Sequence, residues 1–347
     1  MAEHVLDIKN LKVIFPTEMG IVRAVEGIDI EIKKGTCAAL VGESGCGKSV
    51  TSLAAMKLLG EKNAVIRVDK MELCGQDIRN LTEKQMQNLR GKNVSMIFQD
   101  ALSALNPVMT VGKQLDEIFI RHLKLSKKEA KEHSILAMQL VGVPDAKSRY
   151  HSYPHELSGG MRQRILIAMA FACNPDLIIA DEPTTALDVT IQAQVLKVLS
   201  DMQRSHNTSL LLITHDLSVV VHMADEIYVM YCGKIVEHAT THQLFKNPMH
   251  PYTKGLIASV AKMGDEKGAF VQIPDSLPSP MNKPEGCYFH PRCEYAMEKC
   301  RHCMPPLKTM QDGRKLRCWL YERTEGEEVC VYEKDEANVH GKEVADR

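Results

Sequence analysis

The sequence reads Gly42-Glu-Ser-Gly-Cys-Gly-Lys-Ser49 between an apolar run, residues 37–41, and a stretch with helical spacing, residues 50–59. The pattern Gly-x4-Gly-Lys-Ser between a strand and a helix is typical of a loop that binds phosphate groups. Its glycines let successive backbone N–H groups curl around phosphate oxygens, and the start of the helix adds partial positive charge. Lys48 is suited to reach the β- and γ-phosphates, and the Ser49 hydroxyl is suited to ligate Mg²⁺.

Around this loop, short apolar runs alternate with amphipathic stretches from residue 5 to about residue 236, which predicts an α/β fold. Three further runs are typical of buried strands, at residues 94–98, 177–180 and 210–213. Between the first two lies a helix-rich insertion. Within it, Ser126-Lys-Lys-Glu129 has the spacing of a helix capping box.

Composition narrows the class of protein. The 347 residues favour two or three domains. The net charge of -1 gives no support for electrostatic binding to nucleic acid. The longest apolar run, residues 165–173, is too short to span a bilayer, and the first ten residues lack the apolar core of a signal peptide. We therefore expect an intracellular chain that does not itself cross the membrane.

A second candidate element is Leu177-Ile-Ile-Ala-Asp-Glu-Pro183. Its four apolar residues place Asp181 at the carboxyl end of a buried strand, where α/β sheets bind their ligands. Asp181 is suited to hold Mg²⁺ directly or through water, and Glu182 is suited to act as general base for an attacking water. The alternative is a pair of surface acids after a core strand. The glycine loop earlier in the chain favours the catalytic interpretation.

A third element is Leu157-Ser-Gly-Gly-Met-Arg-Gln-Arg164, which opens an apolar helical stretch. Two adjacent glycines disfavour a helix start unless bare N–H groups must meet an anion. The alternative is an ordinary turn before a helix. At this point the chain closely resembles the ATP-binding subunit of ABC transporters, whose signature motif is this Leu-Ser-Gly-Gly sequence followed by Gln.

That resemblance covers residues 5 to about 240 and implies an ABC-type nucleotide-binding fold with a helical subdomain. It also implies roles for residues in the remaining motifs. Gln99 resembles the glutamine that senses Mg²⁺ and contacts the membrane partner, and Ala186-Leu187-Asp188 resembles the D-loop. His215 resembles the switch histidine that contacts the γ-phosphate, although a lone histidine after a strand is usually a surface residue. Phe15 is the candidate for stacking on adenine.

The resemblance further implies a site shared by two subunits. The phosphate loop of one subunit and the signature motif of the other enclose one ATP, so Ser158, Gly159 and Gly160 would serve the nucleotide of a partner. The implied nucleotide contacts are Gly42, Glu43, Ser44, Gly45, Cys46, Gly47, Lys48, Ser49, Val50, Phe15, Ser158, Gly159, Gly160, Gln163 and Asp188. The implied Mg²⁺ contacts are Ser49, Gln99 and Asp181, and Glu182, His215, Lys48 and Gln99 are the implied catalytic residues.

The cysteines are concentrated at the C-terminal end, where six of the 11 lie in the last 61 residues. In a reducing compartment such a group favours metal ligands over disulfides. The motif Gly286-Cys-Tyr-Phe-His-Pro-Arg-Cys293 and the later Arg317-Cys318 resemble the C-terminal extension of oligopeptide and dipeptide importer ATPases. This resemblance implies a [4Fe–4S] cluster, with thiolates from Cys287, Cys293, Cys300 and Cys318.

Zinc is the alternative metal, because Cys300-Arg-His-Cys303 supplies one Cys-x2-Cys pair, and Cys303 or His290 could replace a ligand. A metal-free group of small buried cysteines is the third possibility. The expected organisation is a nucleotide-binding domain at residues 1–240, with its helical subdomain at about 100–160. A connector at 241–284, a Cys-rich metal-binding extension at 285–322 and an acidic tail at 323–347 follow.

The expected function is the energy-coupling ATPase of an importer for di- or oligopeptides, on the cytoplasmic face of the membrane. Its implied partners are two membrane-spanning permease subunits, a second ATPase subunit in a heterodimer and, indirectly, an extracytoplasmic solute-binding protein. Residues 99–110 are expected to receive the permease. Two alternatives stay open at this point: a soluble ABC-type ATPase acting on the ribosome or DNA, and a redox- or metal-sensing ATPase. Nickel or another small solute is an alternative cargo.

Overall fold

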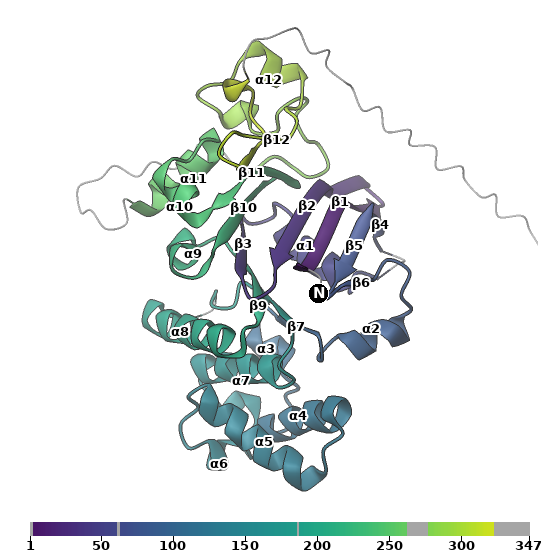
Figure 1. The fold of residues 1–347 in the computed structure, drawn as a ribbon, viewed down its shortest axis with the longest axis vertical. Helices are drawn as coiled ribbons and strands as arrows, with labels where there is room; N and C mark the ends of the chain where they lie inside the picture. Colours follow the sequence, from purple (N-terminus) through teal and green to yellow (C-terminus); the bar gives the residue numbers. More distant parts are fainter. Residues whose placement is uncertain (1–2, 61–62, 186, 262–276, 323–347) are drawn as a thin grey trace, which may run out of the picture.

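The computed structural model describes residues 3–60, 63–185, 187–261 and 277–322. Within these residues, an eight-stranded sheet forms the centre of the molecule, with strand order β12-β13-β11-β10-β3-β9-β8-β7 (Figure 1). The five strands from β10 to β7 in that order run parallel to one another. Strands β11, β13 and β12 each pair antiparallel with their neighbours. Its strands are β3 (Cys37–Val41), β7 (Val94–Ile97), β8 (Leu177–Asp181), β9 (Ser209–Thr214), β10 (Glu226–Tyr231), β11 (Lys234–Thr240), β12 (Lys308–Thr309) and β13 (Lys315–Leu316).

The central parallel strands are buried on both faces. Every residue of β3, β8 and β9 is buried, as expected for strands covered on both sides. Alternate residues of β3 enter two different cores: Ala39 packs with the helices, whereas Leu40 packs toward a second sheet. The strands predicted at residues 37–41, 177–180 and 210–213 are confirmed within one residue at either end, and the strand predicted at residues 94–98 ends one residue earlier than expected, at Ile97.

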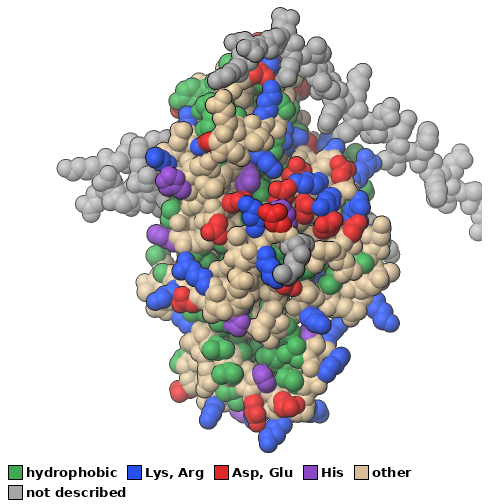
Figure 2. All heavy atoms as spheres, in the orientation of Figure 1, with side chains coloured by type: hydrophobic (Ala, Val, Ile, Leu, Met, Phe, Trp, Pro, Cys, Tyr) green, Lys and Arg blue, Asp and Glu red, His purple; other side chains and the backbone are tan. Residues whose placement is uncertain are grey.

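The second sheet is antiparallel and has five strands in the described part of the chain, in the order β2-β1-β5-β6 with β4 beside β1. They are β1 (His4–Thr17), β2 (Gly20–Lys33), β4 (Val65–Arg67), β5 (Lys70–Leu73) and β6 (Gln76–Asp77). Figure 2 shows acidic and basic side chains interspersed over this part of the surface, where Lys9 pairs with Glu31 and Lys70 pairs with Asp7. Mixed signs on this face agree with the near-zero net charge.

Helices cover the sheets and form a separate lobe around α4 to α6 (Figure 1). The capping box predicted at Ser126 is confirmed: Glu129 N–H donates to Ser126 Oγ at 3.4 Å, and Ser126 N–H donates to Glu129 Oε2 at 2.9 Å. The helices are α1 (Lys48–Ala55), α2 (Glu83–Leu89), α3 (Ala101–Ala104), α4 (Val111–Ile118), α5 (Lys127–Leu140), α6 (Ala146–Arg149), α7 (Gly159–Phe171), α8 (Val189–His206), α9 (Leu217–Met223), α10 (Thr241–Lys246), α11 (Pro251–Ala261) and α12 (Glu298–His302). No helix in the described ranges combines the length and the apolarity that a membrane crossing requires.

The segment predicted to be a connector, residues 241–284, contains α10 and α11 in its first half. Thr240 caps α10 through a capping box with Gln243. Pro251 is the first residue of α11, where the N–H that proline lacks would have no helical partner. Residues 262–276 of the connector, the acidic tail at 323–347 and Ala186 of the D-loop lie outside the described residues.

The Cys-rich extension also joins the main sheet. Strand β13 pairs with β11 through Leu316 opposite Glu237 and Lys315 opposite His238, and β12 pairs with β13. The carboxylate of Glu237 is fully buried and accepts hydrogen bonds from the backbone N–H groups of Met249 and His250, at 3.0 and 2.9 Å. It also pairs with Arg314 Nη1 at 3.4 Å. A buried ion pair therefore holds α11, β11 and the extension together.

Candidate nucleotide-binding site

The phosphate loop lies between the end of β3 and the start of α1, at the carboxyl edge of the central strands. Its shape requires glycine at Gly47, where φ is +111° and a Cβ atom would lie 2.5 Å from the carbonyl oxygen of Ala24. Lys48 is the first residue of α1, so its backbone lies at the positive end of the helix. The loop therefore has the form expected of a phosphate site.

The ammonium group of Lys48 is buried inside this loop. It donates to the carbonyl oxygens of Gly42 at 2.8 Å and Glu43 at 3.0 Å, and it lies 4.0 Å from Glu182 Oε1. The positive charge thus lies between the loop backbone and the acidic group at the end of β8. A triphosphate bound to the loop would meet this charge directly.

Asp181 and Ser49 supply oxygen atoms suited to a magnesium ion. Ser49 Oγ donates to Asp181 Oδ1 at 3.1 Å, and Ser52 Oγ lies 3.4 Å from Asp181 Oδ2. Burial raises the pKa of the Asp181 carboxyl, and the neighbouring charge of Glu182 raises it further. Carboxylate and hydroxyl oxygens are the hard ligands that Mg²⁺ prefers, and a cation there would offset the cost of burying the charge. The residues present therefore fit a magnesium ion.

Glu182 is the centre of a polar network that unites residues from separate strands. Its Oε2 accepts from Gln99 Nε2 at 3.1 Å and from Thr185 Oγ1 at 2.8 Å, and its Oε1 lies 3.3 Å from His215 Nδ1. Glu182 has φ of +45°, a conformation uncommon outside glycine, and its N–H donates to Ile213 O at 2.8 Å. The predicted Gln99 and His215 thus meet the predicted base, and Thr185 is a contact that the motif analysis missed.

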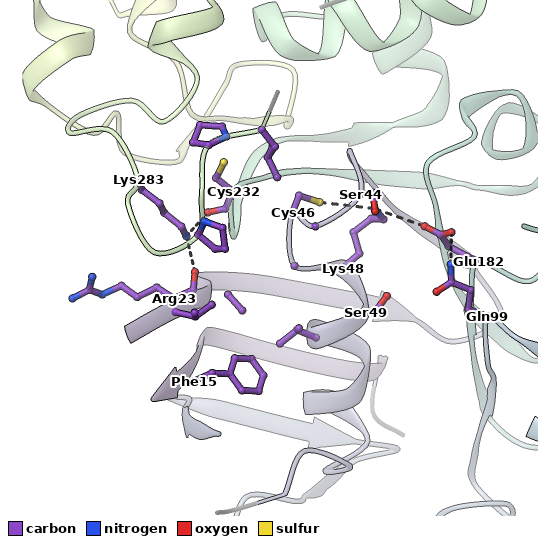
Figure 3. A pocket seen from close by; sticks show the side chains of 18 residues that line it. Phe15, Arg23, Ser44, Cys46, Lys48, Ser49, Gln99, Glu182, Cys232 and Lys283 are labelled. Carbon is purple, nitrogen blue, oxygen red and sulfur yellow. Dashed lines mark hydrogen bonds and ion pairs between the residues drawn. The ribbon is translucent and has the colours of Figure 1, made fainter. Parts of the chain in front are cut away.

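A cavity of about 310 Å³ opens beside the loop (Figure 3). That volume lies at the lower end of the range for small-molecule sites. Phe15 lies on one wall, and residues 16–22 belong mostly to the hairpin of β1 and β2. The sequence did not indicate the opposite wall, which comes from the connector. The lining residues are Phe15, Val22, Arg23, Ala24, Ser44, Gly45, Cys46, Gly47, Lys48, Ser49, Val50, Gln99, Glu182, Cys232, Leu277, Pro278, Pro280 and Lys283.

Several of the implied nucleotide contacts, among them Gly42, Glu43 and Gln163, are outside the described lining of this cavity. The carboxylate of Glu43 instead pairs with Arg292. Gln163 is buried within α7, with 3% of its surface exposed in the single chain, and its contact with a partner's nucleotide stays a prediction.

The signature residues lie away from the phosphate loop of the same chain. Ser158 and Gly159 are exposed, and neither is part of the described cavity lining. Ser158 Oγ caps α7 by accepting from Met161 N–H, and Asp188 Oδ1 caps α8 by accepting from Ile191 N–H. Gly160 packs so closely on Ile191 that a Cβ atom would lie 2.6 Å from Cγ2. The motif therefore forms an exposed helix start supported by α8.

The four predicted cysteine ligands all lie in the Cys-rich extension, where Cys287 N–H donates to Cys300 O at 2.8 Å. Burial, followed by the charges of the neighbouring thiols, raises the pKa of Cys287 to about 12, and burial raises that of Cys318 to about 11. In the described part of the chain, however, no group of three or more Cys, His, Asp or Glu side chains is arranged to hold a metal ion. The geometry therefore does not support the predicted iron–sulfur cluster or the zinc alternative. His290 Nδ1 lies 2.9 Å from Cys287 O.

Three features together define an ATPase of the ABC class. They are a strand, phosphate loop and helix, a buried Asp-Glu pair at the end of another strand, and an exposed Ser-Gly-Gly helix start. Family models agree: residues 25–185 match the ABC transporter family, and residues 236–300 match the C-terminal region of oligopeptide/dipeptide transporters. The chain belongs to the family of ABC transporter ATP-binding subunits, in its oligopeptide/dipeptide branch.

Individual relatives match over nearly their whole length. The chain is 48% identical to the oligopeptide transport ATP-binding protein AppD of Bacillus subtilis, over 93% of this chain and 98% of that protein. It is 44% identical to the dipeptide transport ATP-binding protein DppD of Escherichia coli, over 90% and 95%. A solved dimeric ATP-binding cassette, MJ0796 bound to ADP and Pi, matches in fold with a TM-score of 0.59, at 22% identity over 68% of this chain and 98% of that chain.

Proposed function

We propose that this chain hydrolyses ATP to drive a membrane importer of di- or oligopeptides. The proposal rests on the nucleotide site together with the peptide-transport names of the relatives at 44–48% identity. Peptide as cargo comes from those names. Two membrane-spanning permease subunits, with a solute-binding protein outside the membrane, complete the proposed assembly.

In the proposed reaction, the loop at residues 44–49 binds the triphosphate and Phe15 stacks on the base. A magnesium ion held by Ser49, Asp181 and Gln99 would neutralise charge on the phosphates. Glu182 accepts the proton of the attacking water, and the contacts from Gln99 and Thr185 hold its carboxylate in place. His215 is 55% exposed and so has room to reach a γ-phosphate at the mouth of the site.

We propose that the active form is an ATP-enclosing dimer with a second, related ATPase. The observation that carries this proposal is the separation of the exposed signature residues from the phosphate-loop cavity of the same chain. The exposed start of α7 therefore lies away from the phosphate site of its own subunit. Placed against the phosphate loop of a partner, it would complete the partner's site.

The Ser158→Arg variant is expected to lose ATP-dependent pairing with the cognate second ATPase. The larger side chain would occupy the space that the phosphates of ATP bound to the partner need. Pairing is measured by analytical ultracentrifugation of the two full-length ATPases with ATP and Mg²⁺. The matched control is Ser148→Arg, at an exposed position of α6, which should pair normally. Normal pairing by Ser158→Arg would contradict the dimer proposal.

The proposed location is the cytoplasmic face of the membrane, with residues 99–110 against the permease. Val108 supports this assignment, because it is 80% exposed on a segment that begins at the network residue Gln99. An exposed valine on this segment could contact an apolar side chain of the permease. Movement at this contact would then reach Glu182 through Gln99.

A [4Fe–4S] cluster on Cys287, Cys293, Cys300 and Cys318 stays a prediction of the sequence. Burial raises the pKa of Cys287 and Cys318, so these two thiols would stay protonated unless a cation binds them as thiolates. Anaerobic purification followed by iron and zinc analysis and an absorption spectrum tests the prediction, with about four iron atoms per chain expected for a filled cluster. Zinc in place of iron, or neither metal, would overturn it.

A further inference from the structure

A bidentate ion pair joins the Cys-rich extension to the phosphate loop. Arg292 is the last residue of the short 3-10 helix η4 (His290–Arg292) and donates from Nη1 and Nη2 to the two carboxylate oxygens of Glu43, at 2.7 and 2.9 Å. Only 4% of the Arg292 side chain is exposed. A planar guanidinium bound to both oxygens fixes orientation as well as distance. The pair therefore determines where Glu43 lies.

The other polar groups of Glu43 are also occupied. Its backbone N–H donates to Tyr252 Oη at 2.9 Å, and its carbonyl oxygen accepts from Lys48 Nζ at 3.0 Å. The residue that receives Arg292 thus also receives the lysine of the phosphate site. A shift of Glu43 would move this carbonyl oxygen and alter the position of Lys48.

Arg292 is itself held by an aromatic cluster formed by Tyr231, Tyr252 and Phe289. All three rings are buried, with centroids 4.7 to 5.5 Å apart. Arg292 Nη1 donates to Tyr231 Oη at 3.4 Å, and its guanidinium carbon lies 5.8 Å from the centre of that ring. The arginine is thus pre-positioned by packing between β10, α11 and the extension.

We propose that Arg292 is a positioning residue for ATP binding, which acts through Glu43 to keep the phosphate loop in its phosphate-accepting shape. Neither Arg292 nor Glu43 is part of the described cavity lining, so the effect is indirect. Without Arg292, the carboxylate of Glu43 loses its charged partner and the loop adopts the binding-competent shape for less of the time. The apparent Kd for ATP equals the intrinsic Kd divided by the fraction of molecules with the loop in its binding-competent shape, so it rises as this fraction falls. The inference rests on the proposed ATPase function.

The test compares full-length variants in direct nucleotide binding, and in turnover with the cognate second ATPase. For Arg292→Met, the Kd and KM for ATP are expected to rise about 10-fold or more, while kcat at saturating ATP changes far less. Arg292→Lys keeps the positive charge but cannot bind both carboxylate oxygens as the guanidinium does. Its Kd for ATP should therefore lie between those of the wild type and Arg292→Met. Adding Glu43→Gln to Arg292→Met should recover part of the affinity, because a neutral amide does not need a charged partner.

The matched control is Arg301→Met, at an exposed position of α12 in the same extension, which should bind ATP like the wild type. Thermal unfolding of each variant without nucleotide shows whether it is folded. If Arg292→Met does not fold, the Kd and KM for ATP are measured on Arg292→Lys instead. Wild-type affinity in Arg292→Met, or a loss confined to kcat, would overturn the inference and leave the proposed function intact. A wild-type chain that binds no nucleotide would overturn both.

Discussion

The Glu182→Gln variant is expected to bind ATP with near wild-type affinity and to lose ATP turnover by roughly 10²- to 10⁴-fold, the usual contribution of a general base. The amide matches the carboxylate in size and can still accept the hydrogen bonds from Gln99 and Thr185. It cannot take a proton from water. The site should therefore keep its shape and lose only its chemistry.

Single-turnover hydrolysis and equilibrium binding of ATP separate these two effects. The matched control is Glu298→Gln, which makes the same chemical change at an exposed position of α12 and should leave turnover unchanged. Turnover by Glu182→Gln at the wild-type rate would show that another group activates the water. Loss of binding together with turnover would assign Glu182 a structural role instead.

The second large effect is expected from Glu237→Leu, which should lower the free energy of unfolding by about 3–5 kcal/mol. The substitution leaves Arg314 buried beside an apolar side chain and removes the acceptor for the N–H groups of Met249 and His250. Arg314 then depends on the exposed carboxylate of Asp312, which offsets less of the desolvation cost of its buried charge. Trp319 is the one tryptophan in the sequence and lies in the extension, so its fluorescence during urea denaturation reports on this region.

The control uses the other carboxylate that contacts Arg314. Asp312 lies 2.7 Å from Arg314 Nε but is exposed, so Asp312→Ala should cost no more than about 1 kcal/mol. The double variant Glu237→Leu/Arg314→Leu should recover much of the loss, because it removes both charges. A cost below about 1 kcal/mol for Glu237→Leu would contradict the anchoring role.

The central strands could be predicted because their physical signal is contained in the sequence itself. A parallel strand covered on both faces reads as a continuous apolar run, and β3 was predicted to the residue. The resemblance to ABC transporter ATP-binding subunits likewise indicated Gln99 and His215 as catalytic residues together with Glu182, although Gln99 lies 83 positions away. Thr185 shows the limit: it is a polar residue in a turn, and only the fold places its hydroxyl against Glu182.

The C-terminal contacts could not be predicted, because no local pattern in the sequence indicates them. Strands β12 and β13 have two residues each, which is too short to show any alternation. Arg292 and Glu43 are 249 residues apart, and nothing local in either sequence indicates its partner. Pro251 lies in the segment predicted to be a connector, although proline is also common at the first position of a helix.

The pairing of β13 with β11 limits where this chain can be shortened. A chain shortened after β11 would expose the backbone of that strand along one side of the main sheet, an open template for intermolecular pairing. It would also lose Arg314, which neutralises Glu237. Such a fragment would tend to aggregate rather than behave as a minimal ATPase. A chimera between relatives should therefore exchange β11 and everything after it as one unit.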